Sequence, residues 1–517
     1  MKRSISSFGL LFTSISAIIG SGWLFGAFYT STLAGPAALL AWVIGAIMIM
    51  VVAFVFAELS SMLPISGSST RIPHFTHGAV TSYSFSWVIW LCYMVTCPAE
   101  VQAVIQYLSF YIPGLTYATG ALTHTGYAAA AVLMLAVSIL NTYSLRWLIR
   151  VNSFLTALKL LIPIFMCIVI LVVYFTPDHV IHPAHSTFMP FGFAGVFSAL
   201  SMGGIVYSFN GFKQAAEMAG EAKNPRRAVP FAIIGSVIVC ALVYILLQTA
   251  FFSSIQAVNL TNGWSHLSLE GALSPFADIL KQDNLQWVTP ILMIGAIVGP
   301  LAAGMMYCAS AGRSLYGMSK NGYMPPFFTK LSLQGNPTMA IAANFVLGML
   351  MFAPLPGWDK MASFLTSLMA ITYTIGPISL LALRRQLPDR PRPFKLPAAN
   401  LWCYIAFCIC ALLTYWCGWD IIFKLAIAMV FALLILVIYH VFSPRMRQRK
   451  MHWRESTWLW VYFVGICIIS YLGSFGGGIG VLNVGTSIIV IMIFCLFICW
   501  LACYFRRDRQ HTSPAIA

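Results

Sequence analysis

Charged side chains are scarce in this sequence. Asp, Glu, Lys and Arg together make up only 8% of the 517 residues, whereas 60% of the residues are hydrophobic. Soluble globular proteins carry about 25% charged residues, so this composition excludes an ordinary soluble protein. The chain also lacks a long polar segment in which a separate enzyme domain would fold. The composition therefore indicates an all-α polytopic membrane protein.

Acidic residues are scarcer than basic ones. The chain has 13 Asp and Glu against 29 Lys and Arg, which gives a formal net charge of +16. In a soluble protein such an excess would suggest nucleic acid as a partner. Here the basic residues gather in alternate connections between apolar runs, as the positive-inside rule requires. We therefore interpret the charge as membrane topology and expect no nucleic-acid partner.

The sequence also has few Cys and His residues clustered at the spacings typical of metal ligands. All thirteen Cys lie in apolar stretches, where small buried side chains are their ordinary role. The stretch "DHVIHPAH", residues 178–185, has some of the spacing of a metal site, but an exposed loop is its plainer interpretation. We expect no metal and no cofactor, and nothing in the pattern points to an enzyme.

Long apolar runs are abundant. A membrane-spanning helix needs about 20 apolar residues, and the sequence holds about fourteen such runs. Their centres lie near Ser21, Met48, Val95, Leu133, Ile164, Ser201, Val239, Ala303, Val346, Ile371, Phe407, Val430, Gly465 and Val490. The acidic loop residues alternate with the basic ones across this series, which predicts cytoplasmic positions for both termini in a cytoplasmic (inner) membrane.

Two polar segments do not fit simple spans. "PISGSSTRIPHFTHG", residues 64–78, follows the second run and carries Gly and Pro, so a partly re-entrant loop is one interpretation. "LEGALSPFADILKQD", residues 269–283, predicts a short external helix that can serve as a lid.

Glycine interrupts the first apolar run. "IIGSGWLFG", Ile18–Gly26, contains Gly20, Gly22 and Gly26, and each Gly costs about 1 kcal/mol relative to Ala within a helix. One interpretation is a small-residue face for helix packing. The other is a break in the helix that lines a cavity, because unwound backbone is tolerated there but not toward lipid.

The sixth run has a similar weak point. In "SMGGIVYSFNGF", Ser201–Phe212, Asn210 and three glycines interrupt the apolar pattern. The first and sixth runs each begin a block of five and cross the membrane in opposite directions. Two broken helices at corresponding places of inverted repeats are the sequence pointer to a secondary transporter. Together the two breaks favour the cavity interpretation of the first.

These motifs resemble those of the amino acid–polyamine–organocation (APC) superfamily. Besides the two broken runs, "EAKNPRRAVP", "SAGRSLYGMSKNGYMPPFF" and "FAELSSMLPISGSS" carry the resemblance, which covers residues 6–393. It implies a LeuT-like core of two inverted five-helix repeats. The expected division is a core at 1–393 with repeats at about 8–175 and 191–385, further membrane helices at 394–505, and a cytoplasmic tail at 506–517.

The resemblance also implies the binding residues. In that family the amides of the first break hold a substrate carboxylate, and carbonyls around both breaks hold its ammonium group. Trp23 and Phe209 are expected beside the substrate, and Phe25 and Phe212 are further candidates for closing over it. The implied set is Ile18, Ser21, Gly22, Trp23, Tyr207, Ser208, Phe209 and Asn210.

Three ionisable residues lie within the apolar runs before the sixth. Such residues are costly in a membrane and suggest function. Glu100 suits the pocket or a proton path, with a structural hydrogen bond as the alternative. Lys159 lies about 13 Å along its helix from Arg150, and snorkelling is its alternative role. Glu58 is best interpreted as an interfacial charge paired with Arg71 or another loop cation.

Several proton-coupled members of the family have a lysine at the place of Lys159, where related transporters bind sodium. The resemblance therefore implies coupling to protons and no sodium site. A lysine kept from water pays a penalty for its charge, so it can take up and release a proton at cellular pH.

Lys213 and Glu217 lie four residues apart in the second half of the sixth run, where an i, i+4 pair is the simple interpretation. A cation there favours a substrate with a side-chain carboxylate, as in the aspartate:proton symporter-like members. The sequence leaves open a neutral or an acidic amino acid, and symport or exchange. A channel is a weaker alternative because rings of charged residues are lacking, and a transceptor role would leave no recognisable pattern.

Overall fold

The computed structural model describes residues 5–65, 67–142, 145–175, 181, 187–269, 274–332, 335–443, 447 and 450–508. Regular structure in these residues is helical, and the strand-like contacts are two isolated bridges, Ile5 with Ala222 and Thr116 with Leu122. The predicted all-α class is therefore confirmed for the described chain. The histidines of the 178–185 stretch and the tail from residue 509 lie outside these residues.

The helices follow one another with short connections. The first half comprises α1 Ser7–Ile18, α2 Gly22–Ala34, α3 Ala38–Met62, α4 Ser68–Leu108, α5 His124–Leu140 and α6 Leu145–Tyr174. Next come α8 Gly192–Ser201, α9 Ile205–Ser208, α10 Lys213–Glu217, α11 Pro225–Ser253, α12 Pro275–Gln282, α13 Thr289–Lys320, α14 Thr338–Met351 and α15 Trp358–Gln386. The last are α16 Ala399–Trp416, α17 Trp419–Phe442, α19 Thr457–Leu472 and α20 Val484–Tyr504.

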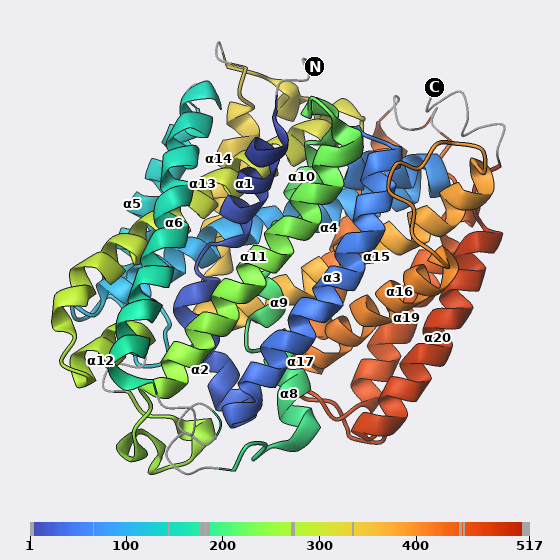
Figure 1. The fold of residues 1–517 in the computed structure, drawn as a ribbon. Coiled ribbons are helices and arrows are strands. Elements are labelled where there is room, and N and C mark those ends of the chain that lie inside the picture. The colour runs from blue at the N-terminus through green and yellow to red at the C-terminus, as the bar shows by residue number, and fades with distance from the viewer. Residues whose placement is uncertain are drawn as a thin grey trace.

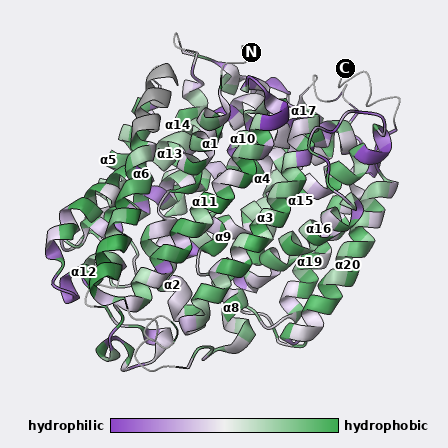
Figure 2. Ribbon diagram, viewed as in Figure 1, coloured by the Kyte–Doolittle hydropathy of each residue, from purple (hydrophilic) through white to green (hydrophobic). Residues whose placement is uncertain are grey.

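The helices are long and apolar enough for a membrane. Within the described ranges, ten have the length and composition to cross a bilayer, counting α2 to α3 as one, and four shorter helices are also apolar. Figure 2 shows hydrophobic residues along the middle of the bundle and hydrophilic ones gathered toward its ends. The chain is therefore a multi-pass membrane protein.

The broken helices lie within the bundle. The helices α3, α4, α11, α13 and α15 surround α1, α2, α9 and α10, whereas α19 and α20 lie at one edge (Figure 1). The most apolar stretches of α4 and α15 are completely buried, but only about a third of that of α17 is. Many apolar side chains of α17 and α20 are exposed, as expected for helices that face lipid.

Most of the polar segment at residues 64–78 forms the first turns of α4 rather than a loop. Helix α4 begins at Ser68, and its only non-helical backbone lies at Gly78, with φ 84° and ψ −166°. The chain's far end supplies partners for this segment: His77 Nε2 lies 3.0 Å from the carbonyl oxygen of Ala502, and the Arg507 amide donates to the Thr76 carbonyl over 2.9 Å. Burial against these residues allows a polar stretch to form a helix there.

The short helix expected within residues 269–283 is present as α12, Pro275–Gln282. Residues 270–273 lie outside the described chain. Phe276 of α12 packs on Trp23 of α2, with ring centroids 6.5 Å apart. The helix therefore touches the half of the first broken helix that follows the break.

Glu58 is an ion-paired residue, as its preferred interpretation stated, although Arg71 is not the partner. Its fully buried carboxylate accepts two hydrogen bonds from Arg384, over 2.9 and 2.7 Å, and lies 3.6 Å from Arg392 Nε. The amide of Leu396 donates to the same carboxylate over 2.8 Å. Glu58 thus joins α3, the end of α15 and the connection to α16.

Candidate functional site

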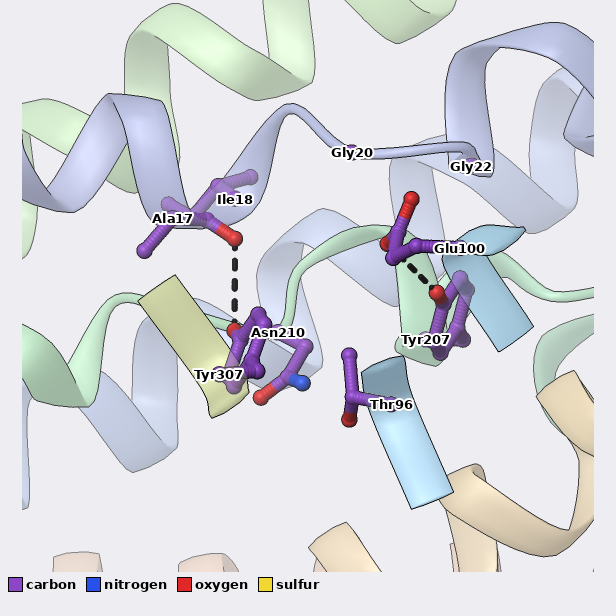
Figure 3. Close-up of a pocket in the computed structure, with 9 residues that line it drawn as sticks. All are labelled: Ala17, Ile18, Gly20, Gly22, Thr96, Glu100, Tyr207, Asn210 and Tyr307. Carbon is purple, nitrogen blue, oxygen red and sulfur yellow. Dashed lines mark hydrogen bonds between the residues drawn. The ribbon is translucent and has the colours of Figure 1, made fainter. Parts of the chain in front are cut away.

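The first broken helix opens at its glycines. Helix α1 ends at Ile18 and α2 begins at Gly22, and the three residues between them belong to neither helix (Figure 3). The first amides of a helix have no acceptor within that helix, and the last carbonyls have no donor. The break therefore presents a partly positive amide end on α2 and a partly negative carbonyl end on α1.

The second break lies between α8 and α10. Gly204 at φ +86° and Gly211 at φ +125° turn the backbone on either side of α9, which has four residues. Such φ values are accessible to glycine without the steric cost that a Cβ brings. The glycine pattern of the sequence therefore sets both ends of this break.

The two breaks lie against each other. A Cβ on Gly211 would stand 2.5 Å from the backbone carbon of Ala17, and a Cβ on Gly22 would overlap the side chain of Ser208. The Tyr244 hydroxyl of α11 joins them by donating to the carbonyls of Ile18, over 3.3 Å, and of Ser208, over 2.8 Å.

Between the breaks lies a small closed cavity. The gaps between its lining atoms are too narrow to hold a water molecule. Side chains from α4 and α13 complete its wall (Figure 3). The lining residues are Ala17, Ile18, Gly20, Gly22, Thr96, Glu100, Tyr207, Asn210 and Tyr307.

Glu100 lines this site beside the first break, near Gly20, Gly22 and Tyr207 (Figure 3). Its Oε1 accepts a hydrogen bond of 2.7 Å from the Tyr207 hydroxyl, which lies 3.2 Å from Ser21 Oγ. A Cβ on Gly20 would overlap the Glu100 carboxyl group, and the Ser21 amide also interacts with it. Oε2 is buried without a hydrogen-bond partner. The amide end of α2 therefore already faces a carboxyl group.

Lys159 lies behind the same break. Its ammonium group is buried and donates to the carbonyl of Ser16, over 2.9 Å, in the last turn of α1. Glu100 interacts with it electrostatically. A cation at the carbonyl end of α1 is favourable because those carbonyls carry partial negative charge. Glu100 and Lys159 thus face the amide end of α2 and the carbonyl end of α1.

Lys213 and Glu217 follow the second break but do not form a close ion pair with each other. Lys213 Nζ donates to Thr372 Oγ1 over 2.9 Å and lies 5.0 Å from the centroid of the Tyr373 ring. Glu217 Oε1 is buried without a hydrogen-bond partner, while its backbone carbonyl accepts from Gly67 over 3.0 Å. Lys213 is therefore a buried cation that donates to a neutral hydroxyl group and also interacts electrostatically with Glu217.

Four of the eight residues expected to bind substrate line the cavity: Ile18, Gly22, Tyr207 and Asn210. Ser21 lies at its edge, bonded to Tyr207. Ser208 lies where the two breaks touch. Trp23 packs toward α12 and α13, and Phe209 packs on Trp42 and Tyr244, so both lie behind the lining. Phe25 packs on Tyr107 and Phe212 on Phe56.

Sequence patterns did not indicate four other residues of the site. Thr96 and Tyr307 line the cavity, and the Tyr307 hydroxyl donates to the Ala17 carbonyl over 3.2 Å (Figure 3). Tyr244 bridges the breaks, and Trp358 donates to Ser21 Oγ over 2.8 Å. Three of the four are aromatic, and because aromatic residues in apolar helices are common, no local signal distinguishes those three from packing residues.

Replacing Gly211 by Ala should destabilise the protein. The positive φ alone costs about 1–3 kcal/mol for a residue with a Cβ, and the new methyl group meets the backbone of Ala17 and Ile18. We expect a lower thermal unfolding midpoint in detergent and weaker substrate binding. Gly317→Ala is the control, because nothing lies within 4 Å of a Cβ there. Equal midpoints for the two variants would contradict the close contact of the breaks.

This sequence is similar to those of known proteins along most of its length. Residues 5–438 match the family described as amino acid permease. The chain is 33% identical to the glutamate/serine transporter AimA of Bacillus subtilis, over 97% of this chain and 93% of the relative. It is 30% identical to the aspartate-proton symporter of the same organism, over 97% and 96%. The chain therefore belongs to the amino acid permease family of the APC superfamily and is a transporter, not an enzyme.

Proposed function

We propose that this protein takes up an amino acid together with a proton by alternating access across the cytoplasmic membrane. The single observation that carries the proposal is the pair of broken helices that meet at a closed cavity containing Glu100. Unwound backbone in a membrane protein is tolerated where it lines such a cavity. Fourteen spans, a LeuT-like core of inverted repeats and cytoplasmic termini belong to the same proposal.

The backbone recognises the part that all amino acids share. The substrate carboxylate binds at the amides of Ser21, Gly22 and Trp23, which lie at the positive end of α2. The substrate ammonium binds at carbonyls of the two breaks: Ile18, Tyr207, Ser208 and Asn210. The side chains around Glu100 leave no free space. They must therefore move apart before the substrate carboxylate and ammonium group can bind.

The substrate side chain is acidic or small and polar. The names of two relatives support this class, since one transports glutamate and serine and the other aspartate. Lys213 supplies the cation for a side-chain carboxylate. Its side chain is buried and its hydrogen bond goes to the neutral Thr372 hydroxyl, so an incoming carboxylate gains a charged partner.

The proton path includes Glu100 and Lys159. They interact with each other, and Lys159 bonds Ser16 at the end of α1 whereas Glu100 interacts with the Ser21 amide at the start of α2. A cation is already present at the carbonyl end of α1, so we propose that no sodium ion is needed there. The name of the aspartate-proton symporter supports proton coupling in a relative.

Proteoliposomes test this function directly. Purified protein is offered labelled aspartate, glutamate, serine, leucine or arginine, with an imposed inward pH gradient or with preloaded amino acid. Uptake of aspartate, glutamate or serine that rises as the outside is acidified supports symport. Uptake that requires preloaded amino acid indicates exchange instead. No uptake of any amino acid would overturn the proposal.

Replacing Lys213 by Gln should change selectivity. A hydrogen bond to a charged group contributes about 1.5–3 kcal/mol, so kcat/KM for aspartate and glutamate should fall about 10- to 100-fold. The value for serine should change little, because serine has no side-chain carboxylate. Lys320→Gln, at the exposed end of α13, controls for the loss of a positive charge. A uniform decrease for all substrates would contradict a role in selectivity.

A further inference from the structure

Trp358 packs between the two broken helices and donates a hydrogen bond to the first. It is the first residue of α15 and is fully buried. Its indole N–H donates to Ser21 Oγ over 2.8 Å, and Ser21 Oγ lies 3.2 Å from the Tyr207 hydroxyl. Since Tyr207 in turn donates to Glu100, the indole is the end of a continuous line of hydrogen bonds that reaches the cavity.

The ring of Trp358 also packs against both breaks. It stacks on Phe25 and Tyr29 of α2, with centroids 4.9 and 5.6 Å apart, and meets the Tyr207 ring edge-on at 5.5 Å. A Cβ on Gly204 would stand 2.7 Å from the indole. The ring therefore occupies the notch that Gly204 leaves in the second break.

The start of α15 is itself held in place. The amide of Trp358 donates to Gln106 Oε1 of α4 over 3.1 Å. The preceding Gly357 has φ +86°, so the chain turns sharply into the helix. Helix α2 is thereby bound, through one side chain, to an anchored end of α15.

This position lies on the outer side of the cavity in the proposed orientation. Helix α2 leads away from the break toward the connection at Gly35, and α15 runs from Trp358 to Arg384 and Arg385. Basic residues mark the cytoplasmic end of a helix, so Trp358 lies at the opposite, outer end.

We propose that Trp358 is the outer gate of the amino acid site, and that release of its indole N–H from Ser21 lets α2 move and opens the site to the outside. This inference rests on the proposed transport function. The bond to Ser21 makes the gate sensitive to the site itself, because the same hydroxyl group interacts with Tyr207 and Glu100. Trp358 is thus a positioning residue for the closed state.

The test replaces Trp358 by Phe, which keeps an aromatic ring but removes the N–H donor. Loss of one hydrogen bond should shift the population toward the outward-open state by about two- to tenfold. In proteoliposomes of one orientation, KM for external substrate should fall and KM for internal substrate should rise. Ser21→Ala should act in the same direction, and the double variant should add little to either single variant.

Trp416→Phe is the matched control. Trp416 is also buried and stacked, on Phe197 at 4.4 Å, but its indole nitrogen has no hydrogen-bond partner. We expect it to leave the ratio of internal to external KM unchanged. If Trp358→Phe changes both KM values equally, or if the two substitutions act alike, Trp358 only fills space and the gate is wrong.

Hydrogen exchange keeps the test independent of transport. Amides of α2, Gly22–Ala34, should exchange faster in Trp358→Phe than in the parent protein, and at the parent rate in Trp416→Phe. Unchanged exchange in Trp358→Phe would overturn the gate even if transport is normal. If the α2 amides exchange faster in Trp358→Phe but the parent protein transports no amino acid, the hydrogen bond from Trp358 to Ser21 holds α2 as proposed. The proposed transport function is then wrong.

Discussion

Replacing Glu100 by Gln should abolish proton-driven accumulation of the substrate while leaving exchange intact. Glu100 lies at the amide end of α2, bonded to Tyr207, where the substrate carboxylate is proposed to bind. Two carboxylates in one buried site repel each other strongly. Substrate binding is therefore favoured when Glu100 carries a proton, and the proton is then carried with the substrate.

The amide of a glutamine has the shape of the protonated acid but binds no proton. For one proton per substrate, a gradient of about 1 pH unit supports roughly tenfold accumulation. Glu100→Gln should reach a ratio of about one, yet counterflow against preloaded substrate should continue. The measurements are the steady-state accumulation ratio and the counterflow rate in the same proteoliposomes.

Glu455→Gln provides the control. Glu455 lies in the short turn before α19, away from the cavity lining, and the substitution removes the same charge. This variant should accumulate substrate as the parent does. Accumulation by Glu100→Gln to the parent level would contradict proton coupling through this carboxyl group, and loss of counterflow would show that Glu100 also binds the substrate directly.

The backbone of the site could be predicted from the sequence because its cause is local. Glycines at 20, 22, 204 and 211 mark the breaks, and the structure ends or turns its helices at these positions. The requirement for φ near +86° or +125° concerns one residue at a time, so a single sequence reveals it. Glu100 and Lys159 were identifiable because charges are rare within apolar runs.

The side chains that complete the site could not be predicted in the same way. Tyr244, Tyr307 and Trp358 reach the breaks from helices 36 to 337 residues away along the chain. Nothing near them in the sequence separates a residue at the site from one in ordinary packing. The expected contact of Trp23 with substrate stays a prediction, and in this structure its ring packs on Phe276.

Distant partners also explain the helix at residues 68–77. Polar residues, Gly and Pro are typical of a loop, yet the segment is helical beneath residues near the end of the chain. The contact between His77 and Ala502 spans 425 residues. Propensity is a weak guide where tertiary contacts decide, and a single sequence does not show which distant segments meet.

Replacing Lys159 by Ala should abolish uptake, and sodium should not restore it. The buried ammonium group bonds the Ser16 carbonyl at the end of α1 and interacts with Glu100. Its loss leaves a buried carbonyl end without a donor, and such a loss costs about 1–3 kcal/mol. It also removes the cation that stabilises the site around the first break. Initial uptake rates measured in sodium and in choline buffers test both statements.

The variant Lys159→Arg distinguishes the role of the positive charge of Lys159 from its role in releasing a proton. Arginine keeps its proton throughout the physiological range, so this variant retains a cation near Ser16 but releases no proton. We expect counterflow to persist and proton-driven accumulation to disappear, as in Glu100→Gln, because the two residues share one proton path. Full accumulation by Lys159→Arg would restrict Lys159 to a structural role. Sodium-stimulated uptake that survives Lys159→Ala would reject proton coupling through Lys159 altogether.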